Sequence, residues 1–188
     1  MPVSHAGNAG GSPKGAMVPI GFVTVTTATS DIQFFNIPQT YTDLRVVLSA
    51  RRTGANYVEG FLFNYLDVSA SLSGCYILNN SGSVYNGINA NQDAVNGGLV
   101  PGASASATIW GTTIIDIFNY SNTNTYKTVM FNSQCDSNSG YGANFLGVGV
   151  SKGSTGGVTT FDIATFSGSD LWAVGTTAQL FGIRTVGK

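Results

Sequence analysis

The chain contains little charge and almost no histidine. Of its 188 residues, 9% are Asp, Glu, Lys or Arg, and Glu59 is the only glutamate. An ordinary globular domain carries roughly 25% of these residues. His5 is the only histidine, so neither a Ser-His-Asp nor a Cys-His nucleophilic site is indicated, and no histidine pair is available for zinc. The shortage of acid–base groups favours a displayed or assembled protein over an enzyme, and we expect no cofactor.

Cysteine, long apolar runs and basic clusters are also scarce. A net charge of −1 argues against nucleic-acid binding, which depends on a positive field. No apolar run approaches the roughly 20 residues that cross a bilayer, so we expect no membrane insertion. Residues 1–14 lack the pattern of a signal peptide, which predicts synthesis in a reducing cytoplasm. Cys75 and Cys135 are then expected to be two buried free thiols, with a disulfide between them as the alternative.

The residues that are abundant favour β-structure. The chain has 25 glycines, 11 phenylalanines and 8 tyrosines among many Ser, Thr and Asn residues. Such a mixture suits short strands and tight turns better than helices. Residues 1–18 are rich in Gly, Ser, Ala and Pro without periodicity, which predicts a flexible or anchoring N-terminal arm. Residues 19–188 are expected to form one β-domain.

Alternation of apolar and polar residues locates the strands. Leu44, Val46 and Leu48 share one phase, and the strongest hairpin joins 106–120 to 126–135 through an Asn/Thr-rich turn. Further strands are expected near 143–151, 158–166 and 179–186, and Gly153–Gly157 is expected to be a hairpin turn. In total we expect nine or ten strands and no helix. The predicted fold class is all-β, an antiparallel β-sandwich resembling a jelly roll.

Two segments suggest contact surfaces. Residues 57–66 are aromatic on one phase and aliphatic on the other, which is typical of a central strand or of a strand pressed against another subunit. The predicted homo-oligomer interface comprises Tyr57, Phe61, Phe63 and Tyr65. Residues 79–106 are expected to be mostly a long loop, with one short strand near 84–88, and long loops often carry function. The predicted ligand contacts, with aromatic rings for sugar stacking, are Tyr85, Asn89, Asn91 and Trp110.

Two further kinds of chemistry have weaker support. Glycoside hydrolysis needs two facing carboxyl groups, one of raised pKa, and no spacing in the chain indicates such a pair. The carboxylates considered are Glu59, Asp67, Asp93, Asp116, Asp136 and Asp162. The segment from Asp136 to Gly140 begins like a calcium loop but lacks its closing glutamate, so an ordinary turn is favoured. We therefore assign no catalytic and no metal-binding residues.

Three segments together resemble a known module. They are residues 37–51, with the turn at Pro38, the hairpin at 115–129, and the closing strand at 178–184. In this order they are similar to a β-rich module of structural proteins in tailed bacteriophages, often labelled tail fibre or virion protein. The resemblance implies a component of the particle, either tail-fibre or capsid-decoration type. It carries no catalytic residues over to this chain.

The resemblance implies a non-enzymatic structural protein on the virion surface. We expect residues 1–18 to attach it to other virion proteins, of capsid or tail, and the β-domain to form a compact knob, spike or decoration. The alternative is a receptor-binding adhesin that holds a host surface glycan through the 79–106 segment. A polysaccharide hydrolase is the third hypothesis.

Overall fold

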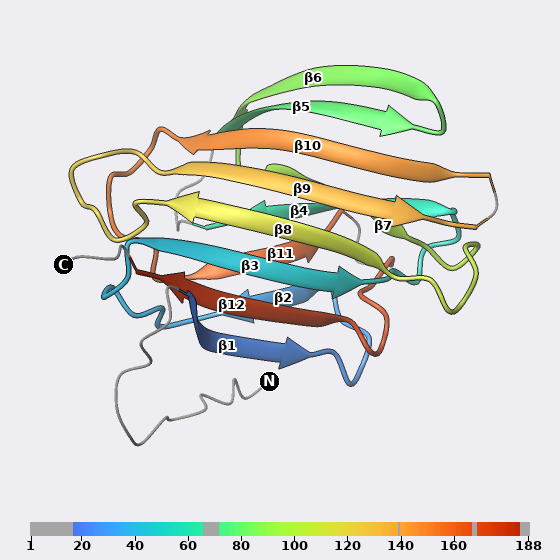
Figure 1. Cartoon of the computed structure of the whole chain (residues 1–188), viewed down its shortest axis with the longest axis horizontal. Helices are drawn as coiled ribbons and strands as arrows, with labels where there is room; N and C mark the ends of the chain where they lie inside the picture. The colour runs from blue at the N-terminus through green and yellow to red at the C-terminus, as the bar shows by residue number, and fades with distance from the viewer. Residues whose placement is uncertain (1–16, 66–71, 139, 167–168, 185–188) are drawn as a thin grey trace.

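The computed structural model describes residues 17–65, 72–138, 140–166 and 169–184, which form two antiparallel β-sheets packed face to face (Figure 1). The predicted all-β sandwich is therefore confirmed. Among these residues, no helix is long and apolar enough to span a bilayer.

The two sheets are unequal in size. The larger has eight strands and the smaller has four, and in Figure 1 the smaller lies behind the larger. In spatial order, the large sheet contains β1 (Met17–Thr24), β12 (Thr177–Ile183), β3 (Asp43–Ala50), β8 (Gly111–Phe118), β9 (Thr128–Asp136), β10 (Gly142–Ser151), β5 (Leu72–Asn80) and β6 (Ser83–Gln92). The small sheet contains β2 (Asp31–Phe34), β11 (Phe161–Thr165), β4 (Val58–Asn64) and β7 (Val95–Pro101).

The core lies between the sheets because alternate residues of each strand point inward. In β3 the inward residues Leu44, Val46 and Leu48 are fully buried, as their alternation predicts. The small sheet contributes mostly aromatic side chains, and Trp172 lies among them with its ring edge-on to Phe61. Aromatic rings bury large apolar areas, so a few of them fill the space between the two layers.

The β8–β9 hairpin is confirmed, and a buried lysine stabilises its turn. Lys127 is fully buried and donates hydrogen bonds from Nζ to the carbonyl oxygens of Asn122, Thr125 and Thr155. Burial lowers the pKa of this amine. Three carbonyl acceptors compensate for part of the cost of removing the ammonium group from water.

The short strand predicted near 84–88 is confirmed as part of β6, but the rest of the segment predicted as a long loop is mostly sheet, so that part of the prediction is wrong. Residues 83–92 form β6, which pairs with β5 at the edge of the large sheet, and residues 95–101 form β7 in the small sheet. The Asn- and Gly-rich composition that indicated a loop belongs to an exposed edge hairpin. Its turn places Ser81 and Gly82 at positive φ, a conformation that suits short polar residues and glycine.

The predicted boundaries need two smaller corrections. Met17 and Val18 belong to β1, so the sheet begins two residues before the end of the predicted arm, while residues 1–16 lie outside the described residues. The segment Gly153–Gly157 is not a hairpin turn, because it joins β10 of the large sheet to β11 of the small one. The described chain forms twelve strands rather than nine or ten.

Candidate functional site

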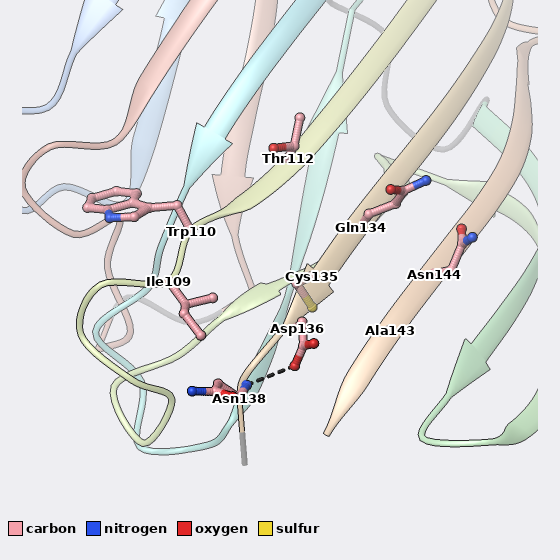
Figure 2. Close-up of a pocket in the computed structure, with 9 residues that line it drawn as sticks. All are labelled: Ile109, Trp110, Thr112, Gln134, Cys135, Asp136, Asn138, Ala143 and Asn144. Atoms are coloured by element: carbon pink, nitrogen blue, oxygen red, sulfur yellow. Dashed lines mark hydrogen bonds between the residues drawn. The ribbon is translucent and has the colours of Figure 1, made fainter. Parts of the chain in front are cut away.

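A groove of about 540 Å³ lies at the end of the large sheet where β8 begins and β9 ends. Its walls come from these two strands, from β10 and from the loop that precedes β8 (Figure 2). The lining residues are Ile109, Trp110, Thr112, Gln134, Cys135, Asp136, Asn138, Ala143 and Asn144. Four of these nine residues carry hydroxyl or amide side chains, and Trp110 is the one aromatic residue among them.

Strand register aligns three polar side chains in one row across the groove. Thr112 on β8 pairs with Gln134 on β9, and Gln134 pairs with Asn144 on β10. All three side chains are exposed on the outward phase of their strands. A hydroxyl and two amides side by side offer both donors and acceptors to a ligand that carries hydroxyl groups.

Trp110 borders the groove and is 36% exposed, and in Figure 2 its ring points away from Thr112, Gln134 and Asn144. It rests on Gly175 of the loop before β12, where an added Cβ would lie 3.0 Å from the ring atom Cη2. Gly175 has φ +94°, a conformation that L-amino acids with side chains rarely adopt. Glycine at this position therefore allows the loop to turn directly beneath the ring.

Arg51 positions the loop that carries Trp110. Its guanidinium is buried and donates from Nη1 to the carbonyl oxygens of Ser106, at 2.6 Å, and Ile109, at 3.0 Å. The Nη2 atom donates to the carbonyl oxygens of Ala105, at 2.7 Å, and Ala103, at 3.4 Å. Four acceptors from one loop fix its path, since a buried guanidinium needs partners for its donors.

The opposite wall is a tight turn after β9. The Oδ1 atom of Asp136 accepts a hydrogen bond from the backbone N–H of Asn138 at 2.8 Å (Figure 2). Asn138 has φ +52° and Gly140 has φ +82°. Ser137 adds two hydrogen bonds to the carbonyl oxygen of Tyr141, from its backbone N–H and from its hydroxyl. This is the turn geometry that the sequence favoured over a calcium loop, with the carboxylate used locally.

The structure does not bring the four predicted ligand contacts together. Trp110 lines the groove, whereas Tyr85, Asn89 and Asn91 belong to β6, at the far edge of the large sheet and separated from β8 by three strands. Tyr85 lies opposite Leu78 in the β5–β6 pairing. Of the predicted set, only Trp110 remains a candidate for this site.

The predicted subunit interface is wrong for three of its four residues. Phe61, Phe63 and Tyr65 are fully buried between the sheets, where no partner subunit can reach them. Their phase of β4 faces the core, and burial raises the pKa of the Tyr65 hydroxyl. Tyr57 remains exposed and stacks on Tyr141, with ring centroids 4.8 Å apart. The alternation of aromatic residues correctly predicted a buried face. That face packs against the other sheet of the same chain rather than against a second subunit.

The described carboxylates considered for hydrolysis do not form a facing pair in the groove, where Asp136 is the only one. Asp67 lies outside the described residues. Burial, and to a lesser degree the charge of Asp31, raise the pKa of Asp162 on β11 to about 6. Asp162 lies on the small sheet, on the phase opposite the buried Phe161 and Ile163, and therefore far from the groove. Its pKa reflects desolvation first, which packing alone produces.

The two cysteines are free thiols, as expected, but only one of them is buried. Cys135 lies beneath the groove, and burial raises the pKa of its thiol to about 11. Cys75 is exposed on β5, contrary to the expectation that both are buried.

We find no matching protein-family model, curated protein or solved structure for this chain, so the groove is interpreted from its own residues. Alternation in the sequence identifies Thr112, Gln134 and Asn144 as outward residues, but only the strand register shows that they are neighbours.

Proposed function

We propose that this chain is a non-enzymatic structural unit displayed on the surface of a tailed-phage virion, and that its groove binds a host surface glycan. The observation that carries the binding role is the exposed row of Thr112, Gln134 and Asn144 in a groove that the exposed Trp110 also borders. The virion setting is supported by the sequence resemblance of the three segments described above.

The composition of the groove suits a neutral sugar. The apolar face of a pyranose ring can stack on an aromatic side chain, while its hydroxyl groups accept and donate hydrogen bonds to amides and hydroxyls. The groove contains one carboxylate, and the backbone of its own turn already uses an oxygen of Asp136. Binding without cleavage is the chemistry that such a set of side chains supports, since glycoside hydrolysis requires two carboxyl groups across the ligand.

The glycan role predicts a strong dependence on Trp110. Replacing Trp110 with alanine is expected to weaken binding at least about tenfold, since aromatic residues at the centre of binding sites are typical hot spots. The probes are purified bacterial O-antigen, capsular and teichoic glycans on an array, followed by titration of the binders. Trp172 is fully buried, so ligand-dependent fluorescence changes are expected to come from Trp110.

A matched control is Tyr126→Ala. Tyr126 is 53% exposed and precedes β9, at the end of the sheet opposite the groove. This variant should bind the same glycans as the unmodified protein. Equal affinity of the Trp110 variant, or no binding to any glycan, would reject the adhesin role and leave the structural role to a separate test.

The virion role predicts that the protein is present on purified particles. Antibody raised against residues 17–184 is expected to label particles in immunogold electron microscopy, and deletion of residues 2–16 is expected to remove that label. Label over the head indicates a decoration unit and label at the tail indicates a fibre unit. Particles that contain every other structural protein but carry no label would exclude both.

A further inference from the structure

The outward face of the large sheet is unusually apolar. Its side chains include Ile77, Ile88, Ile114, Met130, Leu146 and Val148, which are between 36% and 82% exposed. They come from five neighbouring strands, β8, β9, β10, β5 and β6, which lie side by side in Figure 1. Scattered exposed apolar residues are normal, but a group on adjacent strands marks a contact surface.

Strand register makes most of this group continuous, whereas Ile114 is separated from Leu146 by Asn132. Met130 pairs with Val148, Val148 with Cys75, and Cys75 with Ile88, which forms one apolar row across four strands. In the next row Leu146 pairs directly with Ile77. Side chains that pair across strands have Cβ atoms about 5 Å apart, so the two rows form one patch. We call this patch the outer apolar face.

The charge on this face limits what can cover it. Within the described residues of β9, β10, β5 and β6, Asp136 at the end of β9 is the only charged residue. Strands β3 and β8 add Asp43, Arg45 and Asp116. Arg45 and Asp116 neutralise each other at 2.6 Å, and Asp43, at the start of β3, accepts a hydrogen bond from the backbone N–H of Asn119. A covering surface must therefore be neutral and apolar, since unpaired charges are costly at the centre of an interface. The absence of free basic residues on these strands argues against an anionic membrane.

The outward surface of the whole large sheet has the area of a stable protein interface. Its eight strands, about 4.8 Å apart and about eight residues long, cover roughly 1,000 Å², and the outer apolar face is the apolar part of this surface. A stable dimer buries about 800 Å² per partner, with an apolar core and a polar rim. A second copy of this chain provides a surface of this size with the same apolar part.

We propose that the outer apolar face is the surface through which two copies of this chain associate, around a two-fold axis. Each copy then presents the same patch to the other, as in most homodimers. The polar row of Thr112, Gln134 and Asn144 borders the patch on one side and lies at the rim of the interface. This inference depends neither on glycan binding nor on the virion role.

Sedimentation equilibrium of the purified full chain tests the proposal. At about 10 µM the protein is expected to be a dimer, since interfaces of this size bind with dissociation constants of about 1 µM or tighter. Ile77→Asp and Leu146→Asp, each made separately, should weaken dimerisation at least about a hundredfold, because each places two carboxylates in one symmetric interface. The unfolding midpoints of the two variants are compared with that of Val174→Asp. This comparison shows whether a variant that fails to dimerise is a folded monomer or a misfolded chain.

Val174→Asp is the matched control. Val174 is 59% exposed in the loop before β12, and it belongs to no strand of the large sheet. This variant should remain dimeric. A monomeric unmodified protein at about 10 µM would overturn the proposal, as would dimers that persist in both face variants or dissociate equally in the control.

Cys75 gives an independent readout from inside the face. In the dimer its thiol should react with a soluble thiol reagent at least about tenfold more slowly than in the monomeric Ile77→Asp variant. Cys135 is buried with a raised pKa and should contribute little to the signal. Equal reaction rates in the dimer and in the monomeric variant would place the contact surface elsewhere and overturn the proposal.

Discussion

Asp170→Asn is expected to lower the free energy of unfolding by about 3–5 kcal/mol, because it leaves a buried arginine without its counter-charge. Arg52 is 1% exposed, and its Nη2 atom lies 2.6 Å from the Oδ2 atom of Asp170. Asp170 also accepts a hydrogen bond from the backbone N–H of Gly54 at 2.7 Å. One carboxylate therefore neutralises the cation and fixes the neighbouring chain.

The surroundings of Arg52 explain why water cannot replace the charge of the Asp170 carboxylate. The guanidinium lies over the ring of Trp172, 5.5 Å from its centroid, and donates to the carbonyl oxygens of Gly60 and Asp170. Burial lowers the pKa of Arg52, and the charge of Asp170 opposes that shift. Removing this charge leaves a desolvated cation with neutral acceptors and only the charge of Glu59 to oppose it, and breaking a buried pair in this way is costly.

The control is a second ion pair, between Arg45 on β3 and Asp116 on β8. Their side chains are 37% and 21% exposed. Asp116→Asn should lower the free energy of unfolding by no more than about 1 kcal/mol, because solvent screens an exposed pair. Urea unfolding followed by fluorescence measures both variants. Equal losses in the two variants would contradict the assignment of Arg52 as a buried charge.

Gly147→Ala is expected to lower the free energy of unfolding by about 1–3 kcal/mol through overpacking. Gly147 on β10 pairs with Phe131 on β9, whose ring lies directly over it, well inside the space that a Cβ would need. The ring cannot move aside easily, because it packs against Phe63 at 5.5 Å and Phe145 at 5.7 Å in the core.

Gly142→Ala on the same strand is the control. An added Cβ there would meet only the carbonyl oxygen of Cys135, at an ordinary distance of 3.6 Å. Its free energy of unfolding should stay within about 0.5 kcal/mol of the unmodified protein. Thermal and urea unfolding of the two variants compare them directly, and a neutral Gly147→Ala would show that the ring over this glycine can be displaced at little cost.

Ring-over-glycine contacts recur in the sandwich and account for part of its composition. Phe61 lies against Gly97, Tyr76 against Gly87, and Phe166 against Gly60. The sequence predicted β-structure from abundant glycine and aromatic residues, but it assigned the glycines to turns. Composition cannot show that a glycine lies under a ring of a neighbouring strand, because that depends on register.

Local alternation predicted the strands well where one face is buried and the other is polar. The buried phase of β3 and the β8–β9 hairpin follow directly from this pattern. The pattern failed in β4, where apolar residues occupy both phases and either phase could have faced the core. It failed again in β6, where polar residues dominate an exposed edge strand that pairing with β5 holds in place.

The candidate site was only partly predictable for a related reason. Trp110 could be identified as an aromatic contact from the sequence, but its neighbours Gln134 and Asn144 come from other strands. Nothing in the local sequence indicated that the guanidinium of Arg51 would bind four carbonyl groups of the 103–109 segment. Such contacts are set by tertiary packing.

The unequal sizes of the two sheets also affect local stability. The packing contacts of β7, the edge of the small sheet, reach β5, and β6 extends past them (Figure 1). The small sheet therefore covers less of the β5–β6 hairpin than of the centre of the sandwich. Segments with few packing contacts open at the lowest free energies in a folded protein. If two copies associate through the outer apolar face, the partner covers the outward side of this hairpin. Its amide protons would then exchange with solvent at a rate that depends on protein concentration, so that the least protected part of the fold reports directly on assembly.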